Sequence, residues 1–196
     1  MSLRQAVARH PLLAGLAFQA ALIPLALILA RVAGIPLDER IDWSLEAAAL
    51  GALAVLPMLM LLGTLAISGW EPYRALADQV RDFVHQLFRH ALPGAVLLIA
   101  ILAGVGEELL VRGVLQGWLA ERWSPEWAIV AAAIVFGLAH SISRLYFVFA
   151  TVIGLYLGVL YHLTGNLLVV IVAHALYDWI VIHWYLRSRD AGRGGA

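Results

Sequence analysis

The chain has 196 residues, of which 63% are hydrophobic and only 13% charged, and its 13 basic and 13 acidic residues cancel. Soluble domains carry about a quarter charged residues, so this composition indicates a protein embedded in a lipid bilayer. The zero net charge gives no reason to expect a nucleic-acid partner. The sequence has no cysteine, which excludes disulfides, thiol nucleophiles and cysteine-based zinc sites.

Six apolar segments predict an all-α fold, a polytopic transmembrane helix bundle of about six spans. Each segment approaches the roughly 20 residues that are needed to cross a bilayer. The first is too long for the apolar core of a signal peptide, so we expect it to be retained. In chain order the segments cover residues 12–32, 45–68, 92–119, 125–141, 145–163 and 166–186.

Residues 71–90, between the second and third segments, alternate charged residues with apolar residues at helical spacing. This pattern predicts an amphipathic helix on the membrane surface. We therefore expect three regions. Residues 1–90 would hold two spans and this connecting helix, residues 91–187 a four-helix core, and residues 188–196 a disordered tail rich in glycine and arginine.

Arginines gather on one side of the predicted spans, and such an excess marks the cytoplasmic side. With the N-terminus inside, the outer side receives Arg31, Arg40 and Arg122. The inner side receives Arg4, Arg9, Arg74, Arg81, Arg89, Arg144, Arg187, Arg189 and Arg193. We therefore expect both termini in the cytoplasm. The compact size and short loops suggest a prokaryotic inner (plasma) membrane.

The third segment contains three ionisable residues, Glu107, Glu108 and Arg112. An ionised group at membrane depth costs about 2.5–3.5 kcal/mol on insertion, so each needs a partner. Glu108 and Arg112 are four residues apart on one helix face and can neutralise each other. Glu107 is turned about 100° from Glu108 and must face something else. The alternative is an ion-pair network that only fixes how helices pack, but it leaves Glu107 unpartnered.

Histidines in later segments are candidate partners for Glu107. Glu107 lies about 16 residues before the turn that Ser124 caps, and His140 lies about 16 residues after it, so both reach about 24 Å below the outer surface. His174 and Asp178, one turn apart in the last segment, reach about 18 Å. Polar groups from three helices thus converge near one depth, which indicates a site.

Three ordered motifs lie on successive predicted helices. They are Glu107-Glu108-x-x-x-Arg112, Phe136-x-x-x-His140 and His174-x-x-x-Asp178. This set resembles the motifs of the CAAX-processing and bacteriocin-processing intramembrane proteases, the CPBP or Abi family, whose best-known member is the type II CAAX prenyl endopeptidase. The resemblance covers about residues 105–179, and the first two spans carry no comparable signal.

The resemblance implies an intramembrane endopeptidase that cleaves peptide bonds with an activated water. Glu107 would be the general base, and His140 would hold or polarise the water beside it. Glu108 and Arg112 would orient Glu107.

The resemblance also implies roles on the last helix, where His174 and Asp178 would stabilise the oxyanion or complete a metal site. Family members commonly carry Asn where this chain has Asp178, and an ionised Asp cannot donate a hydrogen bond to an oxyanion. Asp178 must therefore be protonated, orient His174, or bind a metal. Gly104 and Gly106 would allow helices to approach closely around the site.

The residues leave open whether a metal takes part. Glu107, His140 and His174 could form the two-histidine, one-carboxylate set of a catalytic zinc site with an open position for water. Without a metal, a desolvated Glu107 could act directly as the base of a glutamate-type protease. The sequence lacks the His-Glu-x-x-His helix of common soluble zinc proteases.

Intramembrane proteolysis is the leading hypothesis, with a peptide or protein substrate that is lipidated or membrane-anchored. A small transporter or proton relay is the alternative, since intramembrane carboxylates and histidines also mark ion paths. The lack of paired broken helices or an inverted repeat counts against that alternative. A non-catalytic immunity or scaffold protein, which would keep these residues for packing alone, is the third hypothesis.

Overall fold

The computed structural model describes residues 10–89 and 91–188, so the predictions for Arg4, Arg9, Arg189, Arg193 and the tail after residue 188 lie outside the described residues. The predicted all-α class is confirmed, since the ordered elements in this part of the chain are all helices. They are α2 (Pro11–Ala33), η1 (Asp38–Arg40), α3 (Leu45–Ile67), α4 (Glu71–Phe88), α5 (Ala95–Glu108), η2 (Leu109–Gln116), α6 (Gly117–Ala120), α7 (Pro125–Ala139), α8 (Arg144–Thr164) and α9 (Leu167–Ser188).

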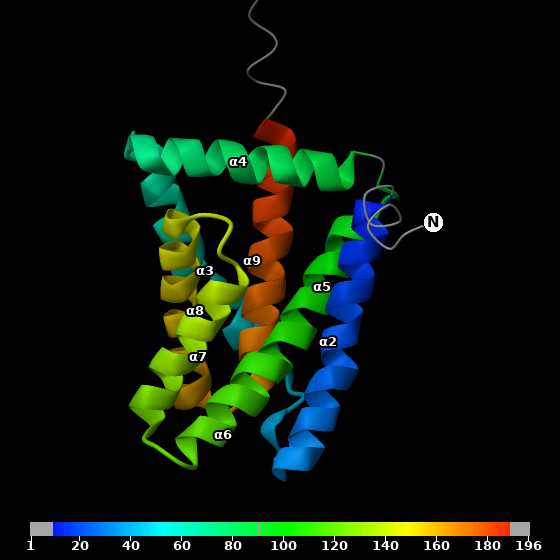
Figure 1. Cartoon of the computed structure of the whole chain (residues 1–196), viewed down its shortest axis with the longest axis vertical. Coiled ribbons are helices and arrows are strands. Elements are labelled where there is room, and N and C mark those ends of the chain that lie inside the picture. Colours follow the sequence, from blue (N-terminus) through cyan, green and yellow to red (C-terminus); the bar gives the residue numbers. More distant parts are fainter. Residues whose placement is uncertain (1–9, 90, 189–196) are drawn as a thin grey trace, which may run out of the picture.

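The long helices form one bundle, and α4 lies across one end of it (Figure 1). Helix α9 runs through the middle, where it packs against α3 and α5, while α2 packs along α5 and α7 packs along α8. The two N-terminal helices therefore share a bundle with the later helices, which carry the predicted motifs. The end that α4 covers is called the α4 end below.

Four helices between residues 10 and 188 are long and apolar enough to cross a membrane: α2, α3, α8 and α9. The count of about six spans is not confirmed, because the other two apolar segments are short or divided. Helix α7 has 15 residues and covers about 22 Å, less than the roughly 30 Å of a hydrocarbon core. The third segment is a helical run divided into α5, the π-helix η2 and α6.

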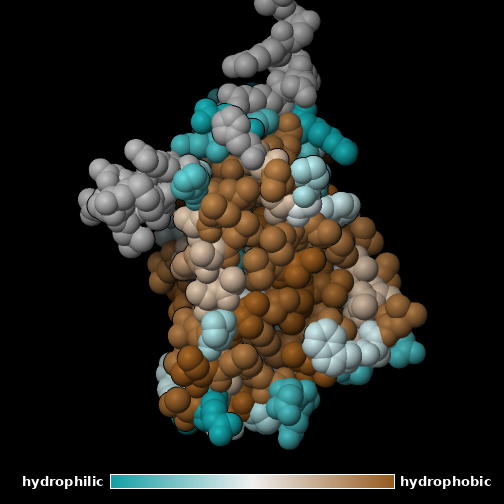
Figure 2. Space-filling model, turned by 90° about the vertical axis from the view of Figure 1, so that its right-hand side faces the viewer, coloured by the Kyte–Doolittle hydropathy of each residue, from teal (hydrophilic) through white to brown (hydrophobic). Residues whose placement is uncertain are grey.

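Large apolar side chains cover the outside of the bundle, as a lipid-facing surface requires. The face in Figure 2 is hydrophobic through its middle and hydrophilic toward both ends. Exposed examples on α2 and α3 are Phe18, Leu25, Leu53 and Met60. With its four candidate spans, the chain is an integral membrane protein.

Helix α4 is amphipathic, as its alternating pattern predicts, and its apolar face is turned into the bundle. The buried residues are Tyr73, Leu76, Ala77, Val84 and Phe88. Two polar contacts fix its position on α9: His85 Nε2 lies 3.1 Å from the Tyr185 carbonyl oxygen, and Arg81 Nε donates to Ser188 Oγ at 3.2 Å. Helix α4 therefore closes this end of the bundle and forms the roof of any cavity beneath it.

Candidate active site

The six predicted site residues meet inside the bundle. Glu107 and Glu108 end α5, and Arg112 follows one turn later on η2. His140 directly follows α7, and His174 and Asp178 lie in the middle of α9. Helix α7 is short and ends in the middle of the bundle without reaching the α4 end (Figure 1). His140, which follows it, therefore lies close to Glu107, with 3.4 Å between Nε2 and Oε2.

Glu108 is a shared acceptor in the most buried part of the site. Its Oε1 accepts a hydrogen bond from Arg112 Nη1 at 2.8 Å and another from His174 Nδ1 at 2.7 Å. The Glu108 and Arg112 side chains are fully buried, so the predicted ion pair is present in a medium of low polarity. Because Nδ1 donates to the Glu108 carboxylate, the other ring nitrogen of His174 is left to face the cavity.

Arg112 is held by more than Glu108. Its Nη2 donates to the Gly154 carbonyl oxygen at 3.0 Å, and its guanidinium lies over the Phe136 ring, 4.7 Å from the centroid. One turn further along, Gln116 Nε2 donates to the Gly158 carbonyl oxygen, also at 3.0 Å. The two glycines are four residues apart on α8, and their lack of side chains leaves both carbonyls open to these donors.

The π-helical geometry of η2 begins directly after the carboxylate pair, and the sequence pattern did not predict it. Short π-helical stretches are often found at functional sites. Arg112 and Gln116 of η2 both donate hydrogen bonds to α8, so they fix the position of η2 against this neighbouring helix.

Glu107 has two oxygens with different surroundings. Oε1 accepts a hydrogen bond from Gln19 Nε2 on α2 at 2.8 Å. Oε2 lies 3.4 Å from His140 Nε2 and 4.0 Å from His174 Nε2. Glu107 therefore faces the histidine that follows α7, at the depth that the sequence predicts, and it offers one free oxygen to the cavity.

His140 is oriented by its own helix. Its Nδ1 lies 2.8 Å from the Phe136 carbonyl oxygen, and the two rings are 4.4 Å apart. Because a carbonyl can only accept, Nδ1 donates to Phe136, and Nε2 faces Glu107. A water molecule in the cavity can therefore contact the Glu107 carboxylate oxygen and the His140 ring nitrogen together.

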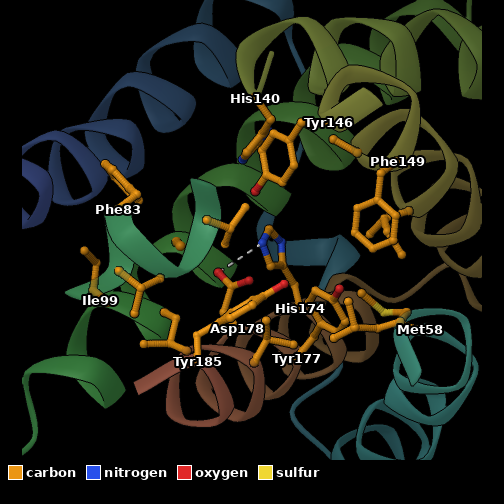
Figure 3. A pocket seen from close by; sticks show the side chains of 18 of the residues that line it. Met58, Phe83, Ile99, His140, Tyr146, Phe149, His174, Tyr177, Asp178 and Tyr185 are labelled. Carbon is orange, nitrogen blue, oxygen red and sulfur yellow. Dashed lines mark ion pairs between the residues drawn. The ribbon is translucent and has the colours of Figure 1, made fainter. Parts of the chain in front are cut away.

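Asp178 lies beside the cavity-facing nitrogen of His174, with Oδ2 3.6 Å from Nε2 (Figure 3). The imidazole is thus flanked by Glu108 on one side and by Asp178 on the other. Figure 3 also shows Tyr146 directed toward the same space from α8. Of the three roles predicted for Asp178, this geometry favours orienting His174.

Two hollows meet at this cluster. A cavity of about 250 Å³ lies beneath α4, and its apolar lining includes Met58, Phe83, Phe149 and Tyr177. A wider groove of about 870 Å³ runs between α2, η2 and α7. Both hollows are lined by Gln19, Glu107, Phe136 and His140. The polar cluster therefore stands where two apolar hollows join.

The predicted metal set is not arranged as a cage. Across residues 10–89 and 91–188, no group of three or more His, Cys, Asp or Glu side chains could hold a metal ion. Ligands of a tetrahedral zinc lie about 3.3 Å apart, since each bond is about 2.0–2.1 Å, whereas His174 Nε2 is 4.0 Å from Glu107 Oε2. Glu107, His140 and His174 therefore do not fit a zinc ion in this structure.

The contact between Gln19 and Glu107 was not predicted from the sequence. The sequence does mark Gln19 as unusual, because it is the only polar side chain between residues 11 and 30. A lone amide in an apolar membrane helix needs a partner, just as a charge does. Its partner lies 88 positions later in the sequence, so spacing along the chain could not reveal it.

Comparisons with known proteins agree with the position of this site. Residues 89–180 match a family described as "Rce1-like: Type II CAAX prenyl endopeptidase Rce1-like". A Bacillus subtilis (strain 168) protein named "Uncharacterized protein YpbD" is 28% identical over 124 residues, which are 62% of this chain and 60% of that protein. No solved structure matches the chain.

Proposed function

We propose that this chain hydrolyses a peptide bond of a protein substrate inside the membrane. Residues 89–180 match the Rce1-like family, which confirms the resemblance carried by the three motifs. The match indicates a protease of the CAAX type. The observation that carries the proposal is the pair of Glu107 Oε2 and His140 Nε2, which face one cavity 3.4 Å apart.

In the proposed reaction, Glu107 is the general base. A water held between Glu107 Oε2 and His140 Nε2 loses a proton to the carboxylate as its oxygen bonds to the carbonyl carbon of the substrate. The carbonyl oxygen becomes an oxyanion, and a protonated His174 can donate to it through Nε2. The C–N bond then breaks, and the proton returns from Glu107 to the departing amine.

Glu108 and Arg112 support this reaction without touching the substrate. Glu108 fixes the ring of His174 through Nδ1, and Arg112 neutralises Glu108 while bonding to α8. Such partners of a catalytic imidazole set its tautomer and its direction. Asp178 would complete the orientation of His174 from the other side of the ring.

The two hollows support a substrate with long apolar parts. The cavity beneath α4 and the groove between α2 and α7 are both lined mainly by apolar side chains, and they join at Glu107 and His140. An extended chain crossing this junction would present one peptide bond to the water. We therefore propose a lipidated or membrane-anchored peptide or protein, because its apolar portions would be desolvated by these linings.

The α4 end is proposed to face the cytoplasm. Among the described residues, the arginines at that end are Arg74, Arg81, Arg89, Arg144 and Arg187. Those at the opposite end are Arg31, Arg40 and Arg122. The excess at the α4 end is the bias typical of a cytoplasmic side. Cleavage would then occur on the cytoplasmic side of the membrane centre.

The test uses purified protein in nanodiscs with a library of lipidated and membrane-anchored peptides. We expect Glu107→Gln and His140→Ala to abolish cleavage while the protein stays folded. His183→Ala is a matched control, because His183 Nδ1 also lies 2.7 Å from the carbonyl oxygen four residues earlier and its ring also contacts an aromatic one. Full cleavage by Glu107→Gln would contradict the assignment.

The same preparation separates the alternatives. Proton or solute flux in liposomes without hydrolysis would support a transporter or proton relay. A cellular phenotype that survives Glu107→Gln but is lost when the bundle is disrupted would support a non-catalytic immunity or scaffold protein.

A further inference from the structure

We propose that Gln19, on the first membrane helix, is a positioning residue that turns the free oxygen of Glu107 toward the attacking water. The inference rests on the proposed hydrolytic function and adds to it a residue from outside the matched region 89–180. It is carried by one contact, the 2.8 Å hydrogen bond from Gln19 Nε2 to Glu107 Oε1.

The contact fixes which way the carboxylate faces. A carboxylate can rotate about its last carbon–carbon bond, and a donor on one oxygen restricts that rotation. With Oε1 held by α2, Oε2 is left toward His140 and His174, at 3.4 Å and 4.0 Å. The amide must present its NH₂ to Glu107, because two oxygens in contact would repel each other.

The surroundings argue against a purely structural role for Gln19. Its own Oε1 is buried, and no described residue donates a hydrogen bond to it. A buried carbonyl oxygen without a donor destabilises a folded protein, and an apolar side chain of similar size would avoid that loss. An arrangement that costs stability but holds a carboxylate in a cavity is typical of a functional site.

The backbone of α5 makes the contact possible. At Gly106, a side-chain carbon would lie 3.0 Å from the Gln19 carbonyl oxygen and 3.0 Å from Leu22 Cβ. Any larger residue there would push α2 away from α5. Gly106 thus sets the close approach that brings the Gln19 amide within reach of the next residue, Glu107.

The test compares Gln19→Met and Gln19→Glu with wild type in nanodiscs. Gln19→Met removes the amide at nearly constant size. Gln19→Glu keeps the shape but replaces the neutral amide donor by a second carboxyl group, which either repels the Glu107 carboxylate or shares a proton with it. We expect kcat to fall about 10–100-fold in both variants, a range typical of residues that orient catalytic groups, with KM changed less than about threefold. We expect Gln19→Met to unfold at the same temperature as wild type or a higher one.

Ala20→Met is the matched control, since Ala20 is the exposed neighbour on α2 and lines neither hollow. It should keep the wild-type kcat. A second readout does not depend on turnover: the infrared carboxylate band of Glu107, assigned by its loss in Glu107→Gln, should shift in Gln19→Met and not in Ala20→Met.

The outcomes separate this inference from the proposed function. Cleavage by wild type together with an unchanged kcat in both Gln19 variants would overturn the positioning role and leave the hydrolytic function standing. An unshifted band in Gln19→Met would overturn the contact itself. Absence of cleavage by wild type would overturn the hydrolytic function, and the positioning role with it.

Discussion

At the scale of single residues, the site depends on how buried charges are compensated. Glu108 and Arg112 are fully buried, and each has hydrogen-bond partners beyond the other. Separating such a pair leaves one charge in a medium that cannot solvate it, which costs far more than losing a surface pair. The stability of the bundle and the order of the site therefore depend on the same contacts.

Replacing Glu108 by Gln should destabilise the protein, because the charge of Arg112 then has no counter-charge on Oε1. We expect a loss of about 3–5 kcal/mol, seen as a fall of roughly 10 °C in the unfolding midpoint in detergent. Glu121→Gln is the control, since the Arg40–Glu121 pair is partly exposed and should contribute less than about 1 kcal/mol. Equal midpoints for both variants would contradict this account.

Asp178 allows a comparison of charge with shape. If its role is to orient His174, Asp178→Asn should keep most of the activity, because the amide oxygen can still accept from Nε2. Asp178→Ala leaves that nitrogen without its neighbour and should lower kcat/KM by about 10–100-fold. Steady-state kinetics of the two variants test this, and equal losses would show that the charge itself is required.

At the scale of helices, the site is held by close approaches at glycines. A side-chain carbon at Gly104 would lie 2.9 Å from Ala175 Cβ and 2.9 Å from the Ile171 carbonyl oxygen. Helix α5 can therefore touch α9 directly, and this contact brings the carboxylates of α5 to His174. The predicted role of Gly104 and Gly106 in close helix approach is confirmed.

Gly104→Ala should therefore push α5 from α9. Overpacking of this kind costs about 1–3 kcal/mol, and the displacement should also lower cleavage. Gly63→Ala on α3 is the matched control, because nothing lies within 4 Å of the carbon it would add. That substitution should be neutral or slightly stabilising. Unfolding midpoints and cleavage rates of the two variants provide the check.

The sequence predicts the helices well and the contacts between them only in part. Apolar runs and polar interruptions place the helix ends within a few residues, and four-residue spacing predicts the Glu108–Arg112 and His174–Asp178 pairs. The shared acceptor Glu108 and the Gln19 contact join residues 66 and 88 positions apart, where local spacing carries no information. The π-helix is likewise hidden, because its residues suit an α-helix equally well.

At the scale of the whole molecule, the bundle has two different ends. Helix α4 covers one end and forms part of the cavity lining, while short turns close the other. A chain entering the cavity under α4 meets Glu107 only after passing an apolar lining. The proposed orientation decides which compartment supplies the water and receives the released product. The orientation can be tested without measuring catalysis.

The absence of cysteine makes that orientation measurable with single cysteines in an otherwise cysteine-free chain. Asp82 is an exposed residue of α4, and Glu39 is an exposed residue of η1 at the opposite end, so each can be replaced by cysteine. Because the excess of arginine is at the α4 end, we expect an impermeant maleimide to label Glu39→Cys in intact cells or spheroplasts. Asp82→Cys should react only after the membrane is opened. Labelling of Asp82→Cys in intact cells would reverse the proposed orientation and place the covered cavity on the outer side.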